Sequence, residues 1–327
     1  MTLMHAAYVT KTGGPEVLEY TEVEAPIAGP GQVLVKVAAA GVNFIDVYLR
    51  SGVYPRPLPA VLGGEGAGTV EALGEGVDGL AVGDRVAWAD GGSGSYAEYD
   101  VVAANRLVAV PEGVDLETAA ASMLQGMTAH YLVNSTWPLA AGETALVHAA
   151  AGGMGQLLTQ LAKAKGARVI GTTSSEAKAR IAREAGADEV VDYTEVADLA
   201  AEVRALTGGR GVDVVYDGVG KTTFEASLGS LRKRGLLALY GGASGPVPPF
   251  DPQTLNRLGS LFLTRPTLVN YIETREELEW RSGEILAAVA DGGLKINVGA
   301  RFPLAQAADA HTALAGRATT GKVLLIP

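Results

Sequence analysis

Residues 146–156 read LVHAAAGGMGQ and join an apolar run to a segment of helical character. Ala150, Gly152 and Gly155 give the spacing A-x-G-x-x-G directly after the apolar residues. At such a junction the middle glycine lets the backbone approach a pyrophosphate, and the last one lets the helix pack closely on the strand. The N–H groups at the start of the helix attract the anion. The stretch therefore predicts a dinucleotide-binding loop, with Ala150 as a mild substitution for the first glycine.

The segments around this loop alternate between apolar strands and amphipathic helices. We predict strands at residues 145–149, 168–172, 189–191, 212–216 and 236–240. Helices are predicted before and between them, at residues 116–133, 153–165, 176–185, 196–206 and 222–231. This alternation implies right-handed βαβ units, and hence an α/β fold with a Rossmann-type doubly wound parallel sheet.

The first part of the chain, to about residue 110, consists of short β-type runs broken by glycine and proline. Examples are residues 33–37, 68–73, 85–88 and 96–102. Short strands with turn residues between them are typical of a compact barrel-like or sandwich-like domain. After residue 275 the sequence predicts two helices and a final strand at 323–326.

Composition narrows the class of protein. A chain of 327 residues is long enough for two domains. It has no Cys, which excludes disulfides, thiol nucleophiles, Fe–S clusters and Cys-containing zinc sites. The net charge of −10 argues against a nucleic-acid partner. Without a signal-peptide pattern or a long apolar stretch, we expect a cytoplasmic protein that does not associate with a membrane.

Two other features are interpreted as structural. The stretch Gly316–Lys322 resembles a phosphate loop up to its lysine, but Val323 replaces the required Ser or Thr and a strand follows in place of a helix. We interpret it as a turn. The four histidines show no metal-ligand spacing, and His148 is the one nearest to a predicted site.

The end of the second predicted strand bears on which cofactor is bound. An acidic residue about 20 positions after the glycine loop would bind the ribose 2′-hydroxyl of NADH. Here the strand is followed by Thr173, Ser174 and Ser175, with Lys178 one helical turn later. A lysine and hydroxyl groups attract a 2′-phosphate, whereas an acid would repel it. A lone lysine at this place is more often a solvated helix charge, but together with the missing acid it favours NADPH.

Several segments in the same order resemble the quinone oxidoreductase (zeta-crystallin-like) branch of the medium-chain dehydrogenase/reductase superfamily. They are residues 43–52, 63–68, 124–129, 149–155, 216–220, 263–266 and 321–327. The resemblance covers essentially the whole chain. It implies a mostly β, GroES-like catalytic domain at residues 1–123 and 268–327 and a Rossmann domain at residues 124–267. It also implies a homodimer formed near Leu261–Thr264.

The resemblance also implies that the chain holds no zinc. The zinc alcohol dehydrogenases of the same superfamily have a cysteine, a histidine and a cysteine on the catalytic metal, and this chain has Asn43, Gly64 and Gln125 there. Without a Lewis acid, hydride release from an alcohol is difficult. A quinone or another conjugated carbonyl is already electrophilic and does not need that help.

Site residues follow from the resemblance, position by position. The residues implied to contact the cofactor are Asn43, Asp46, Val47, Tyr131, Ala151, Gly152, Gly153, Met154, Gly155, Ser174, Ser175, Lys178, Tyr193, Gly218, Gly242, Ala243, Ser244, Gly245, Leu263, Thr264, Arg265 and Arg317. Gly218 stands where the family can have a serine, so a hydroxyl contact is lost there. Asp46 is interpreted as a buried carboxylate that pairs with a backbone or basic group. For Tyr193, the sequence favours packing of the aromatic ring and contact with the cofactor about equally.

The resulting hypothesis is metal-free reduction of a quinone by hydride or single-electron transfer from NADPH. Tyr48 and Asn43 are the candidates to donate hydrogen bonds to the developing oxyanion, and Tyr54 and Arg265 are candidates to shape the substrate pocket. One alternative is an NADPH-dependent enone or alkenal double-bond reductase, because hydride then adds to the β-carbon. Another is an NADPH-binding protein with a structural or RNA-binding role, although the acidic net charge opposes RNA binding.

Overall fold

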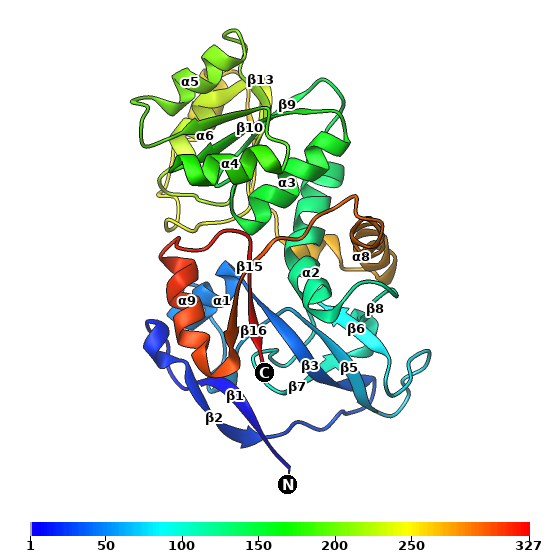
Figure 1. Cartoon of the computed structure of the whole chain (residues 1–327). Coiled ribbons are helices and arrows are strands. Elements are labelled where there is room, and N and C mark those ends of the chain that lie inside the picture. Colours follow the sequence, from blue (N-terminus) through cyan, green and yellow to red (C-terminus); the bar gives the residue numbers. More distant parts are fainter. Residues whose placement is uncertain (1) are drawn as a thin grey trace. The chain divides into compact units, whose positions relative to one another are not determined.

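The computed structural model describes residues 2–327 (Figure 1). The chain divides into two compact units. Unit 1 consists of the chain up to Met127 together with Ile272–Pro327, and unit 2 consists of Thr128–Tyr271. Within residues 2–327, no helix combines the length and the apolar character required to cross a membrane.

Unit 2 is built on a six-stranded parallel sheet with the order β11-β10-β9-β12-β13-β14. Its strands are β9 (Thr144–Val147), β10 (Arg168–Thr173), β11 (Glu189–Asp192), β12 (Val212–Asp217), β13 (Leu231–Leu239) and β14 (Phe262–Thr264). The chain runs outward from β9 to β11, and then returns to place β12 on the other side of β9. The predicted doubly wound sheet is thus confirmed, with its switch point between β9 and β12.

The helices of this unit flank the sheet, and four of them lie in two pairs (Figure 1). The helices are α3 (Gly153–Ala164), α4 (Glu176–Glu184), α5 (Leu199–Leu206), α6 (Phe224–Ser230) and α7 (Gln253–Arg257). Helix α3 packs against α4 and β10, while α5 packs against α6. Helix α6 begins two residues later than predicted because Thr223 bonds to Asp217 in the preceding turn. The core between the layers is apolar and includes Leu146, Ile170 and Val215.

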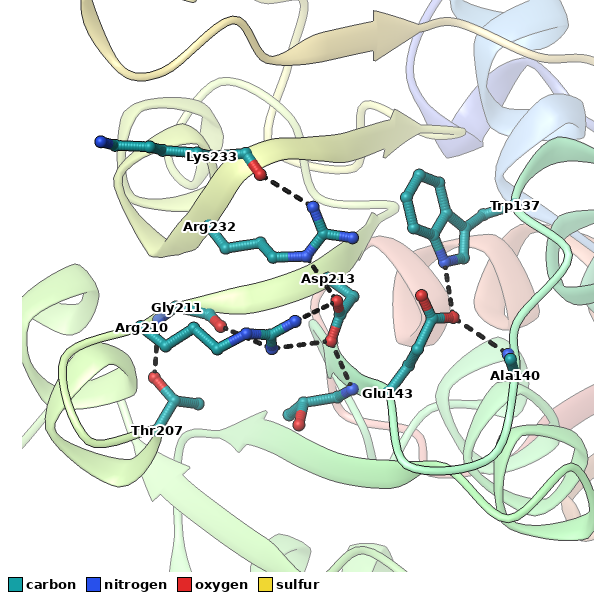
Figure 2. A network of polar contacts seen from close by, with 10 residues as sticks. Trp137, Ala140, Glu143, Thr207, Arg210, Gly211, Asp213, Arg232 and Lys233 are labelled. Atoms are coloured by element: carbon teal, nitrogen blue, oxygen red, sulfur yellow. Dashed lines mark hydrogen bonds and ion pairs between the residues drawn. The ribbon is translucent and has the colours of Figure 1, made fainter.

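A polar network holds the amino-terminal ends of three of these strands together (Figure 2). Asp213 of β12 accepts from Arg210 at 2.6 Å, from Arg232 of β13 at 2.5 Å and from the N–H of Thr144 of β9 at 2.8 Å. Its side chain is 1% exposed. Burial by itself raises the pKa of Asp213, but the bonds from Arg210, Arg232 and Thr144 outweigh it and lower the pKa to about 2. Asp213 is therefore a buried anion that joins β9, β12 and β13.

Unit 1 contains the predicted mostly β domain. Its larger sheet has the order β15-β16-β3-β5-β6-β8, with β7 also paired to β3. The strands are β3 (Gln32–Val42), β5 (Gly66–Leu73), β6 (Arg85–Trp88), β7 (Tyr99–Ala103), β8 (Val108–Ala109), β15 (Val298–Pro303) and β16 (Lys322–Ile326). A second sheet has the order β2-β1-β4, with β1 (Leu3–Val9), β2 (Glu19–Glu24) and β4 (Ala60–Val61). Val33, Val86, Trp88 and Leu325 belong to the core of the unit.

The last strand of the chain has an interior position in this sheet. β16 pairs with β15 on one side and with β3 on the other, where Val323 faces Val42 and Leu324 faces Gly41. This register brings Lys322 beside the end of β3, at which α1 (Phe44–Ser51) begins. The other helices are α2 (Leu116–Tyr131), which continues into unit 2, α8 (Arg275–Ala290) and α9 (Ala307–Ala315).

Candidate active site

The glycine loop of unit 2 has the backbone that its sequence predicts. β9 ends at Val147, and α3 begins at Gly153 with Gly152 as its N-cap. A Cβ atom on Gly155 would lie 2.4 Å from the carbonyl oxygen of Ala149 and 2.6 Å from Cα of Ala150, so a side chain cannot be accommodated there. Ala150 fits in place of the first glycine because Gly171 of β10 leaves room for its methyl group. The loop and the start of α3 form a backbone cradle of the kind that suits a pyrophosphate.

The residues predicted to bind a 2′-phosphate follow the neighbouring strands β10 and β11. Ser175 caps α4, and its Oγ accepts the N–H of Lys178 at 3.4 Å. Nζ of Lys178 lies 3.4 Å from Oγ of Ser174. Tyr193 follows β11, is 40% exposed, and donates its N–H to the carbonyl of Thr173. Because carboxyl ends of parallel strands lie at one edge of a sheet, these groups share an edge with the glycine loop.

The loops that follow β12 and β13 are held together by a buried aspartate that the sequence analysis did not select. Asp217 is fully buried and accepts the N–H groups of Val219 and Gly220 at 2.8 and 3.0 Å. This turn brings Gly218 next to the 242–245 loop, where the N–H of Ala243 donates to the carbonyl of Gly218. Ser244 bonds to Val219 through both its N–H and its hydroxyl group. Gly242, Ala243, Ser244 and Gly245 thus lie beside Gly218.

His148 has a structural role, as predicted for the histidines. It is 1% exposed, with Nδ1 at 3.0 Å from the hydroxyl of Thr172 and Nε2 at 2.9 Å from that of Ser227. Because Ser227 donates to Asp217, it accepts from His148, which places the proton on Nε2. Burial lowers the pKa of His148. The neutral ring links β9, β10 and α6 beneath the loops.

The remaining predicted residues of unit 2 lie at β14 and α2. Leu263 and Thr264 end β14 and are half-buried, and the following Arg265 is exposed. Tyr131 is buried, and its ring stacks on that of Tyr271 with the centroids 4.1 Å apart. β14 forms one edge of the six-stranded sheet.

In unit 1, Asn43 stands at the junction of β3 and α1. Its N–H donates to Oδ2 of Asp46 at 2.9 Å, which forms a capping box at the start of α1. Asp46 is fully buried and also accepts from the hydroxyl group of Tyr96 at 3.0 Å. Burial raises the pKa of Asp46 to about 6, against the lowering effect of the bonds from Asn43 and Tyr96. This agrees with the prediction of a buried carboxylate that pairs with the backbone.

The side chain of Asn43 is bonded to charged residues that are distant in the sequence. Its Oδ1 accepts from Nζ of Lys322 at 2.7 Å, and its Nδ2 donates to Glu65 at 2.8 Å and to the carbonyl of Gly41 at 3.3 Å. Both amide N–H groups therefore have acceptors within unit 1. Donation from Asn43 to a substrate oxyanion would require one of these bonds to break.

The same geometry tests whether the zinc of related dehydrogenases fits here. Of the three corresponding positions, Gly64 has no side chain, and the amide oxygen of Asn43 is taken by the Lys322 ammonium. Gln125 donates to the same oxygen at 3.4 Å. Among residues 2–327, no three His, Asp or Glu side chains converge in a way that could hold a metal ion. These residues do not fit a zinc ion.

The other predicted residues of unit 1 lie on α1 and near α9. The ring of Tyr48 meets that of Tyr54 edge to face, with the centroids 5.3 Å apart, and the N–H of Tyr54 donates to the carbonyl of Tyr48. Val47 is half-buried between Asp46 and Tyr48 in the sequence of α1. Arg317 is exposed, follows α9 and has a φ of 57°. The predicted residues thus fall into two sets, one in each unit.

Comparison with known proteins places the chain in a family. Residues 29–112 match the family described as alcohol dehydrogenase GroES-like domain, and residues 153–282 match that described as zinc-binding dehydrogenase. The quinone oxidoreductase of Pseudomonas aeruginosa is 49% identical over 326 residues, which is 99% of each chain. The 2-haloacrylate reductase of a Burkholderia species is 43% identical, over 99% of each chain.

A solved structure gives the same result in three dimensions. A mycobacterial protein complexed with NADPH superposes with a TM-score of 0.97 at 52% identity, over 99% of this chain and 100% of that one. The fold, the geometry of the site and the sequence identity over nearly the full length all indicate the same family. The chain belongs to the quinone oxidoreductase (zeta-crystallin-like) branch of the medium-chain dehydrogenase/reductase superfamily.

Proposed function

We propose that the protein is an NADPH-dependent quinone oxidoreductase. The observation that carries the proposal is the glycine loop, with Ser174, Ser175 and Lys178 following the neighbouring strand β10. No acidic residue ends β10 itself, and the next carboxylate, Glu176, is exposed at the start of α4 and pairs with Arg183 at 2.7 Å. The quinone oxidoreductase of Pseudomonas aeruginosa and the mycobacterial protein complexed with NADPH support it. The test is oxidation of NADPH and of NADH, followed at 340 nm with 1,4-benzoquinone and 9,10-phenanthrenequinone. Quinone reduction with NADH but not with NADPH, or with neither cofactor, would contradict the proposal.

Residues of unit 2 would hold most of the cofactor. The loop Ala151–Gly155 and the start of α3 would bind the pyrophosphate through N–H groups. Lys178, Ser174, Ser175 and Tyr193 would bind the 2′-phosphate. The remaining contacts proposed in this unit are Tyr131, Gly218, Gly242, Ala243, Ser244, Gly245, Leu263, Thr264 and Arg265. Bound NADPH supplies a hydride or an electron from nicotinamide C4.

Residues of unit 1 would serve the acceptor and the nicotinamide. Tyr48 is the proposed donor to the oxyanion that forms on the quinone, because its hydroxyl group would gain a charge-assisted bond as negative charge develops. Asn43, Asp46 and Val47 would border the nicotinamide. Since the Asn43 amide hydrogens already have acceptors, we propose that its contribution is placement of neighbouring groups. Tyr54 and Arg265 would shape the substrate pocket, and Arg317 would contact a phosphate.

The proposal includes no metal. A positive ammonium bonded to the Asn43 oxygen and a glycine at position 64 make a poor ligand set for zinc. A quinone is electrophilic without a Lewis acid, so orientation against the nicotinamide can supply much of the rate acceleration. Turnover that is unchanged after dialysis against a strong chelator, and that added zinc does not raise, is the expected result.

Reduction of a conjugated carbon–carbon double bond is the second candidate function. It is favoured by the 43% identity to a 2-haloacrylate reductase. A panel of two quinones, crotonaldehyde, 1-octen-3-one and 2-chloroacrylate separates the two activities by kcat/KM. Higher kcat/KM for the enones or the haloacrylate would replace quinones as the substrate class. NADPH binding without turnover of any of these acceptors would favour a binding protein, the third alternative.

We also propose a homodimer formed through the edge strand of unit 2. β14 ends the six-stranded sheet, so its outer backbone groups are available for pairing, and Phe262 in it is 57% exposed. Phe262→Asp should give a monomer in light scattering if two copies join there. A wild-type protein with the mass of one chain would rule the dimer out.

We also propose that the protein is located in the cytoplasm. Cell fractionation tests this location.

A further inference from the structure

Lys322, the first residue of β16, is a buried lysine with a buried partner. Its side chain is 2% exposed, and that of Glu65 is 0% exposed. Nζ of Lys322 lies 2.5 Å from Oε2 of Glu65 and 2.7 Å from Oδ1 of Asn43. Burying two charges is costly, and the cost is recovered only when further hydrogen bonds satisfy both groups. Further hydrogen bonds do satisfy Lys322 and Glu65, and the same bonds fix the side chain of Asn43.

The carboxylate of Glu65 is surrounded by donors from three segments. Oε1 accepts the N–H of Leu124 at 2.6 Å, and Oε2 accepts Nδ2 of Asn43 at 2.8 Å in addition to Lys322. A Cβ atom on Gly41 would lie 2.0 Å from Oε2 of Glu65 and 2.9 Å from Cε of Lys322. Gly41 therefore provides the space in which the ion pair lies. β3, β16 and the middle of α2 all contribute to this cluster within unit 1.

The ion pair allows the amide of Asn43 only one orientation. An ammonium can only donate and a carboxylate can only accept, so the amide oxygen must face Lys322 and the amide nitrogen must face Glu65. The flipped amide would place N–H groups against the ammonium and an oxygen against the carboxylate. Asp46 fixes the backbone of the same residue through its N–H. Asn43 is thus held at both its main chain and its side chain.

We propose that Glu65 and Lys322 are positioning residues that act through Asn43. They keep its amide in a single orientation at the place where it borders the nicotinamide. The inference rests on the proposed function, because the role of Asn43 beside the cofactor belongs to that proposal. A group that is fixed before the substrate arrives contributes to the rate, and small displacements of such a group are costly.

The test uses a double substitution, because removal of one partner leaves a buried charge unpaired and destabilises the fold. In Glu65→Gln/Lys322→Met both charges are removed. Gln at position 65 can still accept from the N–H of Leu124, but it also offers N–H groups to Asn43, so the Asn43 amide loses its single orientation. Met at position 322 keeps the length of the apolar stem.

The kinetic experiment is a cycle of four proteins: wild type, Asn43→Ala, Glu65→Gln/Lys322→Met and the triple variant. We expect Asn43→Ala and the double variant each to lower kcat about tenfold, with the KM for NADPH little changed. If the pair acts through Asn43, the triple variant has the kcat of Asn43→Ala to within about twofold. Losses that multiply in the triple variant, or a double variant with wild-type kcat, would overturn the inference.

Two further variants separate positioning from stability. Gly41→Ala keeps both charges but displaces the Glu65 carboxylate, so it should lower kcat in the wild-type background and not in the Asn43→Ala background. Asp213→Asn/Arg232→Met removes the ion pair between the buried Asp213 and the half-buried Arg232 in unit 2 and is the matched control. It should lower the melting temperature and leave kcat unchanged. A loss of kcat in this control as large as that in Glu65→Gln/Lys322→Met would show that stability alone explains the effect.

A measurement without turnover separates this inference from the proposed function. The side-chain NH₂ resonances of Asn43 can be assigned in ¹⁵N spectra by their loss in Asn43→Ala. We expect them to exchange slowly with water in the wild type and rapidly in the double variant. Equal exchange rates would overturn the inference. Failure of the wild type to reduce any quinone, with this difference in exchange present, would contradict the proposed function and leave the positioning of Asn43 supported.

Discussion

Nε2 of His311 lies 3.2 Å from the hydroxyl oxygen of Tyr96, in the interior of unit 1. Nη1 of Arg50 lies 3.2 Å from Nδ1 of the same ring. Because the guanidinium can only donate, Nδ1 is the acceptor and Nε2 carries the proton. Nε2 then donates to Tyr96, and Tyr96 donates to Asp46. A neutral His311 completes a chain of hydrogen bonds that ends at the capping box of Asn43.

His311 should make the protein sensitive to acid. Burial, followed by the charge of Arg50, lowers its pKa to about 3. Between pH 6.5 and 3 the unfolded chain therefore takes up a proton that the folded protein does not, and stability falls with pH by up to about 3–5 kcal/mol. His311→Gln keeps one acceptor and one donor and should abolish this loss. The measurement is urea unfolding of both proteins from pH 7 to 4.

Asp46 contributes to the same profile with the opposite sign. Its folded pKa of about 6 lies above the usual value, so folding gains stability as pH falls from 6 toward 4. The wild type and His311→Gln share this contribution, so it largely cancels when the stability of one is subtracted from that of the other. A difference between wild type and His311→Gln that does not change with pH would contradict a buried neutral histidine.

Asp213→Asn should destabilise the protein in a pH-dependent way. The folded pKa of about 2 lies below the usual value, so the ionised carboxylate contributes stability that is fully present above about pH 5 and is lost as pH falls toward 2. The shift corresponds to about 2 kcal/mol at pH 7. Unfolding by urea at pH 7, 4 and 3 should show the gap between wild type and variant becoming smaller. The control is Asp251→Asn, which breaks an exposed ion pair with Arg257 and should cost no measurable stability.

Lys178→Ala should weaken binding of NADPH but not of NADH. A charge-assisted bond to the 2′-phosphate is worth about 1.5–3 kcal/mol, so the KM for NADPH should rise roughly tenfold to a hundredfold. The half-buried Lys163 of the same unit pairs with Asp188 and gives the control, Lys163→Ala, with no expected change for either cofactor. Equal rises in KM for NADPH and NADH would assign Lys178 to something other than the 2′-phosphate.

Tyr48→Phe should lower the rate of quinone reduction with NADPH affinity preserved. The variant keeps the ring that packs on Tyr54 and removes only the hydroxyl group. Loss of one donor to a developing oxyanion lowers kcat/KM about tenfold or more. Stopped-flow kinetics with several quinones, together with NADPH titration by fluorescence, measures both quantities. Tyr54→Phe keeps the same ring pair and is the matched comparison. Wild-type turnover of Tyr48→Phe with every quinone would remove its hydroxyl group from the mechanism.

The sequence predicts unit 2 well because its signals are local. Strand, loop and helix around Gly152 and Gly155 follow one another within a few residues, and their periodicity is typical of βαβ units. Ser174, Ser175 and Lys178 could be selected for the same reason, since they directly follow a predicted strand. Asp217 was missed, although it ends β12, because its bonds to the following turn are apparent only once the backbone is folded.

Unit 1 is less predictable because its polar contacts join residues that are far apart in the sequence. Lys322 is 257 positions from Glu65, and Arg50 is 261 positions from His311. The stretch Gly316–Lys322 predicts only a turn, and a single lysine before a strand gives no sign of a buried partner. The insertion of β16 between β15 and β3 creates these contacts, and no periodic pattern encodes it.

That interior position of β16 has a consequence for the nascent chain. The ribosome releases Asn43 and Glu65 early, but β16, which pairs with β3, begins at Lys322, 257 positions after Glu65. Unit 2 is continuous and can fold in the meantime, whereas β3 waits with an unpaired edge and Glu65 waits without its counter-charge. Products of premature termination that lack residues 322–327 would therefore have a finished nucleotide-binding unit and an open sheet. Such products should be readily degraded or aggregate.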